Sequence, residues 1–111
     1  MKKVYLYFQK YELGSLSEKD SQYLWTPNPD IIKEYNEKVF FAFLYKLNEN
    51  EPTLYDYMPR HFREFVDASK REDLKQNAKI EEGDSDFEKL YKMATLSYLE
   101  NDYYIKLKNE D

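Results

Sequence analysis

Residues 39–47 form the most apolar run of the sequence, with four aromatic residues and one charge. The run contains neither glycine nor proline, which favours a strand buried on both faces over a half-exposed strand that would alternate apolar with polar residues. The polar segment 48–52, which ends in Pro52, stops the run after about the length of a strand. We therefore expect 39–47 to be the central strand of a sheet, with a buried helix as the alternative.

The segments before this run predict a meander of three strands, over 3–8, 11–16 and 22–26. A polar turn at 17–21 separates the second strand from the third. Pro27 and Pro29 cannot donate to a sheet ladder, so the third strand should end there. Pro29 also suits the first turn of a helix, which predicts a short helix over 30–35 before the central strand.

After the polar loop, the apolar residues recur at helical spacing around Pro59. Thr53 is a candidate helix cap, and 54–58 is expected to form a short turn. Because the residue before a proline avoids the helical region, a proper helix should begin at Pro59 and end near Ala68.

The remaining elements predict two more helices and a strand. The charged segment 69–78 is weakly amphipathic and is expected to be a surface helix. Ser85 and Glu88 have the spacing of a capping box, which predicts a helix from Asp86 onward. Alternation over 103–108 predicts a last strand.

These elements define the expected fold class as α+β. It is a small, mainly antiparallel sheet, made of the N-terminal meander, the central strand 39–47 and the C-terminal strand 103–108, packed with three to four short helices. With 111 residues, the chain has the length of a single domain, 1–111.

Composition excludes several classes of protein. The sequence has no cysteine, which rules out disulfides and thiolate metal sites. A net charge of −5 argues against direct nucleic-acid binding. No apolar segment has the length of a signal peptide core or a membrane span, so we expect a cytoplasmic protein without a membrane partner. Twelve tyrosines suit strands and protein interfaces, although AT-rich codon usage would produce the same bias.

The sequence contains no pattern of an enzyme or a cofactor site. His61 is the only histidine, and no motif joins it to a nucleophile or a carboxylate. The acidic residues around Gly83 lack the spacing of a calcium loop. Gly14 and Gly83 are the only glycines, which excludes a phosphate-binding glycine loop. We expect no catalytic residues, no metal and no cofactor.

The order of elements resembles the N-terminal subdomain of HipA-type serine/threonine kinases, which also exists as a separate small protein of the HipS type. Residues 11–17, Tyr-Glu-Leu-Gly-Ser-Leu-Ser, are similar to the opening "VG-x-L" strand of that family, and 25–32 are similar to its "Y-x-P-x-W-L" segment. Residues 54–65 lie where the family has "FF-x-x-LLPE". Residues 86–90 resemble its "FDLL" helix start, and 103–107 fall on its "GAV-x-L" strand.

The sequence also departs from that family. The family's "SLSLPL" corresponds here to 41–47, without the proline, and its "LPE" becomes Met58-Pro59-Arg60. The glycine of the late helix turn is replaced by Ala94 or Thr95.

The resemblance implies a non-enzymatic, antitoxin-like regulator that binds and inhibits a HipA-like or HipT-like kinase toxin, alone or in a complex with a DNA-binding antitoxin. The ATP site and the catalytic motifs would then belong to the kinase. A different class is a small acidic inhibitor from a phage or another mobile element, which would occlude a basic nucleic-acid-binding surface. A third is a subunit of a stable assembly.

The expected partner contacts lie around the proline-led helix, which in the resembled family is near the side that faces the kinase. Tyrosine, methionine and arginine are enriched at interface cores, and the arginines could bind acidic or phosphorylated groups. For Trp25 the default interpretation is a core residue, and an exposed anchor is the other. For Tyr57, Met58 and Phe62, packing on the sheet is the alternative. The expected contacts are Trp25, Tyr57, Met58, Arg60, His61, Phe62 and Arg63.

Overall fold

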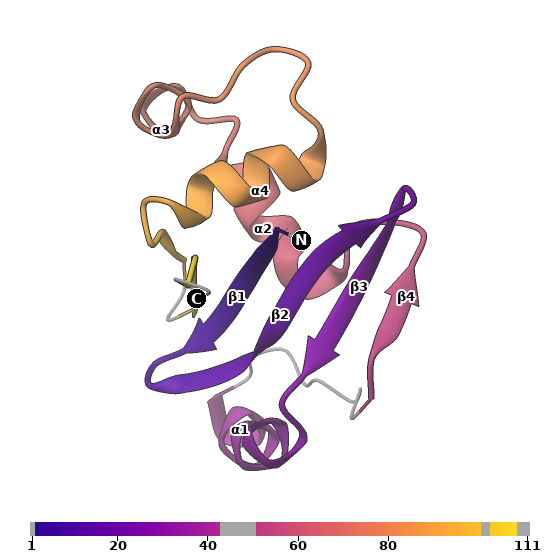
Figure 1. Cartoon of the computed structure of the whole chain (residues 1–111). Coiled ribbons are helices and arrows are strands. Elements are labelled where there is room, and N and C mark those ends of the chain that lie inside the picture. Colours follow the sequence, from indigo (N-terminus) through magenta and orange to yellow (C-terminus); the bar gives the residue numbers. More distant parts are fainter. Residues whose placement is uncertain (1, 43–50, 101–102, 109–111) are drawn as a thin grey trace.

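The chain folds into an antiparallel sheet packed with helices (Figure 1). The computed structural model describes residues 2–42, 51–100 and 103–108. In these ranges the strands are β1 (Lys3–Phe8), β2 (Tyr11–Lys19), β3 (Gln22–Pro27), β4 (Thr53–Tyr55), β5 (Leu99–Glu100) and β6 (Tyr103–Lys106). The helices are α1 (Pro29–Ala42), α2 (Arg60–Ala68), α3 (Glu72–Ala78) and α4 (Asp86–Ala94). The strand order β4-β3-β2-β1-β6-β5 confirms the α+β class.

The predicted N-terminal meander is confirmed by the pairing of β1 with β2 and of β2 with β3. The turn between the second and third strands is shorter than expected, because β2 continues to Lys19. Asp20 and Ser21 form the connection, with φ of 50° and 67°. Two successive positive φ angles are typical of the tight hairpin turns whose twist matches that of the strands.

The expectation of a central strand at 39–47 is wrong for its first part. Residues 39–42 belong to α1, which begins at Pro29, one residue before the predicted helix 30–35, and continues to Ala42. No glycine or proline interrupts the sequence between these ends, and a helix that has formed adds residues at little cost. Residues 43–47 lie outside the described residues. The centre of the sheet is formed by β2 and β1.

The hydrophobic core lies between one face of the sheet and the helices α2 and α4. From the sheet, the fully buried side chains include Leu6, Leu16 and Ile105. Helix α4 packs on β1 and β6 and contributes Leu90 and Met93. In Figure 1, α2 lies behind β2 and β3, so the opposite face of these strands is toward the reader.

The elements after the polar loop follow the prediction with two differences. Thr53 does not cap a helix, because it starts the short strand β4, which pairs with β3. Helix α2 starts at Arg60, one residue after Pro59. The surface helix in 69–78 is confirmed as α3. In the part of the chain that the structure describes, no helix is long and apolar enough to cross a membrane.

The C-terminal elements also follow the sequence. Ser85 caps α4 by accepting a hydrogen bond from the Glu88 backbone N–H at 3.1 Å. The predicted strand at 103–108 is confirmed over Tyr103–Lys106 as β6. It pairs with β1, and the sequence pattern did not predict its other neighbour, the two-residue strand β5.

Candidate functional site

The seven expected contact residues separate into a buried group and an accessible group. Side chains of the first group are at most 3% exposed, and they cannot reach a partner in this conformation. The buried group is Trp25, Met58 and Phe62. The accessible group is Tyr57, Arg60, His61 and Arg63, with His61 half-buried.

Trp25 is a core residue, which agrees with its default interpretation, and not an exposed anchor. Its ring meets the ring of His61 edge-on, with 4.5 Å between centroids, and the ring of Phe62 at 5.6 Å. Such edge-to-face pairs stabilise the packing of α2 on β3 beyond the area that they bury. Met58 lies in the same core, so these three residues are removed from the expected interface.

Two large apolar side chains are exposed between β4 and the start of α2. Tyr57, between β4 and α2, is 64% exposed, and Leu54 of β4 is 51% exposed. Leu54 pairs with Leu24, which alternates with the core residue Trp25, so Leu54 projects from the sheet face opposite α2. We call the group Leu54, Tyr57, Arg60 and Arg63 the β4–α2 surface. Leu54 is not among the expected contacts, because a short turn was predicted at 54–58. The β-prone triplet Thr53-Leu54-Tyr55 directly after Pro52 was the available signal.

Local contacts position this surface. Gln22 at the start of β3 donates a hydrogen bond to the Asp56 carboxylate at 2.6 Å, which anchors the segment beyond β4. The rings of Tyr55 and Tyr57 meet edge-on at 6.0 Å. The first turn of α2 has Arg60 and no acidic residue. A cation is unfavourable at this end of a helix, so helix stability does not account for an arginine there.

Arg63 makes an ion pair with Asp86 of α4, with 3.5 Å between Nη1 and Oδ2. Both side chains are more than a third exposed, and pairs of this kind contribute little to stability. Arg63 could therefore exchange this partner for another acidic group. Nearby, burial raises the pKa of the Tyr23 hydroxyl, and the carboxylates of Asp86 and Glu18 raise it further.

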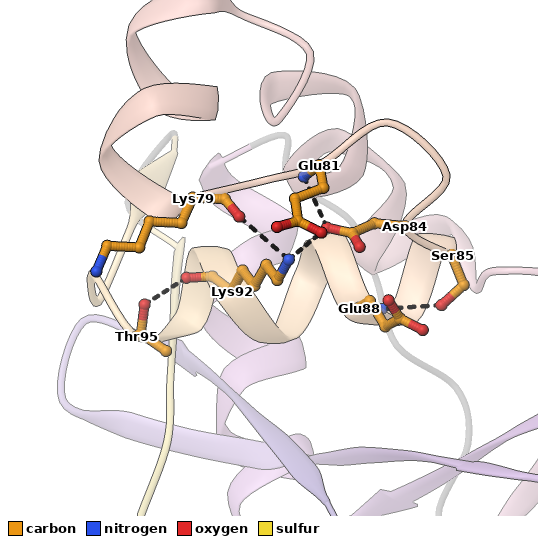
Figure 2. Close-up of polar contacts among 7 residues, drawn as sticks. All are labelled: Lys79, Glu81, Asp84, Ser85, Glu88, Lys92 and Thr95. Atoms are coloured by element: carbon orange, nitrogen blue, oxygen red, sulfur yellow. Dashed lines mark hydrogen bonds and ion pairs between the residues drawn. The ribbon is translucent and has the colours of Figure 1, made fainter.

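The acidic loop before α4 has a structural role, which Figure 2 shows. Lys92 donates to the Asp84 carboxylate at 2.6 Å and to the Lys79 carbonyl at 3.1 Å. The Glu81 backbone N–H donates to the same Asp84 oxygen at 2.9 Å. These hydrogen bonds hold the pKa of Asp84 below its ordinary value, and the bond to Asp84 raises the pKa of Lys92. Asp84 thus closes the loop on α4.

The described residues contain no group of three or more histidine, cysteine, aspartate or glutamate side chains that could hold a metal ion. A cavity of about 330 Å³ opens beside α3. Its lining is Ser69, Lys70, Lys75, Ile80, Glu81, Glu82, Gly83 and Lys89. The lining carries three lysines and two glutamates, and the hydroxyl of Ser69 donates a hydrogen bond to the Val66 carbonyl at 2.5 Å.

Comparisons with protein-family models, with curated proteins and with solved structures find no match to this chain.

Proposed function

We propose that this protein is a non-enzymatic regulator that acts by binding another protein through the β4–α2 surface. The observation that supports this proposal is the exposure of Leu54 and Tyr57, at 51% and 64%, in the same short stretch of chain as two exposed arginines of α2. Aromatic and arginine side chains are the types enriched where protein interfaces are fully desolvated. Arginine would add paired hydrogen bonds to a carboxylate or phosphate of the partner.

The sequence resemblance makes a HipA-type serine/threonine kinase the first partner to test, with the chain acting in the cytoplasm as an antitoxin-like inhibitor. The kinase would supply the ATP site. The direct experiment measures binding of the purified chain to a HipA-type kinase of the same genome by calorimetry, and autophosphorylation of the kinase with and without the chain. Binding with a fall in autophosphorylation would support the proposal, and absence of binding would contradict this partner.

Variants locate the interface. Leu54→Ala should weaken binding by more than about 1 kcal/mol if Leu54 is a contact. Leu99→Ala is the matched control, because Leu99 is a leucine of similar exposure, 60%, at the opposite edge of the sheet. Equal affinities of the two variants would remove the β4–α2 surface from the interface, even if the kinase binds.

A second candidate function is that of an acidic inhibitor that covers a basic nucleic-acid-binding surface. The net charge of −5 favours it, because a basic groove attracts an acidic competitor. The chain would then release DNA from the target protein in a gel-shift assay, and the release would weaken as salt is raised.

A further inference from the structure

The sheet face opposite α2 and α4 gathers lysine and tyrosine side chains. Tyr5 pairs with Lys106 and Tyr7 with Tyr104 across β1 and β6, and residues directly opposite each other project from the same face. Lys3 alternates with Val4, which is in the core, and so projects with Tyr5. We call this group the lysine–tyrosine face: Lys3, Tyr5, Tyr7, Tyr104, Lys106 and Lys108.

The side chains of this face are ordered by one another. The rings of Tyr7 and Tyr104 stack in parallel, with 4.9 Å between centroids and 5° between planes. The ammonium groups of Lys106 and Lys108 lie 4.7 Å and 4.5 Å from the ring centroids of Tyr7 and Tyr5. Cation–π contacts of this kind hold a flexible lysine in place, which lowers the entropy lost when a partner binds it.

Charge on this face is opposite to that of the whole chain. Among the described residues, the ion pair of this face joins Lys108 to Glu12, which also accepts a hydrogen bond from the Tyr7 hydroxyl at 2.8 Å. Neither Lys3 nor Lys106 has a carboxylate partner among the described residues. The described residues of this face therefore carry net positive charge on a chain whose net charge is −5.

We propose that the lysine–tyrosine face binds an acidic, extended segment of a partner protein. The ammonium groups of three lysines, together with tyrosine hydroxyls, could bind carboxylates that are spaced along an extended peptide. A single-stranded nucleic acid fits less well, because bases need ring faces on which to stack. Tyr7 is only 8% exposed, with Tyr104 stacked on it and Lys106 over its ring. The inference rests on the proposed protein-binding role but concerns β1 and β6, whereas Leu54 lies on the same sheet face in β4, three strands away from β1.

The test measures binding of a short fluorescein-labelled peptide of alternating glutamate and serine, by fluorescence anisotropy at low salt. The double variant Lys106→Gln, Lys108→Gln should weaken binding about tenfold. The control Lys33→Gln, Lys75→Gln removes the same charge from exposed positions on α1 and α3 and should bind as wild type does. If the double variant fails to fold, Lys3→Gln replaces it, since Lys3 is exposed at the start of β1, and it should weaken binding measurably.

Three results would overturn the inference: no binding of the peptide, an equal loss in the control, or tighter binding of an oligothymidylate with the same number of negative charges. Leu54→Ala should leave peptide binding unchanged. If the kinase does not bind, the proposed partner is contradicted, but the peptide-binding test of this face still stands.

Discussion

Gly14 of β2 lies directly against the ring of Trp25 of β3. A Cβ atom built on Gly14 would lie 2.8 Å from Cη2 of Trp25 and would also meet the backbone carbonyl of Thr26. Glycine at this position leaves room for the indole of Trp25, which also contacts the ring of Phe62 in α2. The packing of α2 on Trp25 therefore depends on Gly14, which lies in β2, inside the sheet.

Gly14→Ala should lower the free energy of unfolding by about 1–3 kcal/mol, because the added methyl group overpacks a rigid part of the core. Urea denaturation measures the change. Gly83→Ala is the comparison, since nothing lies within 4 Å of its Cβ position and its cost comes from a φ of +99° alone. A Gly14 variant as stable as wild type would mean that β2 and β3 separate easily at Trp25.

Phe62→Ala and Tyr57→Ala should have different effects. Phe62 is fully buried, so its truncation should cost about 3–5 kcal/mol. Tyr57 is 64% exposed, and its truncation should change the unfolding free energy by no more than about 0.5 kcal/mol. Thermal melts followed by circular dichroism distinguish the two. A large loss of stability in Tyr57→Ala would show that this ring is structural and would weaken its assignment to the interface.

Ser85→Ala should destabilise the protein by about 1 kcal/mol, because it removes the acceptor for the Glu88 N–H at the start of α4. Chemical denaturation measures the loss. Ser85→Asp keeps an acceptor at the cap and should retain most of the stability. If both substitutions cost the same, capping is not the source of the effect.

The pH dependence of stability should depend on Asp84. Its pKa is lowered in the folded state by the Glu81 N–H and by Lys92, so its contribution is complete above the ordinary value of 3.8 and is lost as the pH falls through the lowered pKa. The pKa of Lys92 is raised, so its contribution is complete below 10.5 and is lost at higher pH. Tm measured against pH should therefore fall at both extremes. Asp84→Asn should flatten the acid side of this profile, and an unchanged profile would contradict the assignment.

The isolated chain should neither bind ATP nor transfer phosphate. Its two glycines lie in β2 and in the loop before α4, and neither belongs to a glycine-rich phosphate loop. Calorimetric titration with ATP and magnesium should give no heat of binding. An affinity in the micromolar range would contradict the proposal of a non-enzymatic regulator.

Local sequence determined the elements whose signals are local. The meander, the Pro29 start of α1, the Pro59 boundary of α2 and the Ser85 cap were all predicted, because turns, prolines and caps act over a few residues. The run at 39–47 shows the limit of such signals. A continuous apolar segment has no period that separates a buried strand from a buried helix, and α1 extended into it from Pro29.

Tertiary structure decided which side chains are exposed. Trp25 and Tyr57 are both large aromatic residues near a proline in the sequence. Trp25 is fully buried, because α2 packs on it, whereas Tyr57 is 64% exposed. The lysine–tyrosine face arises from the pairing of β1 with β6, which joins the two ends of the sequence. Residue types alone cannot specify such a pairing, since it depends on the register of strands nearly the whole chain apart.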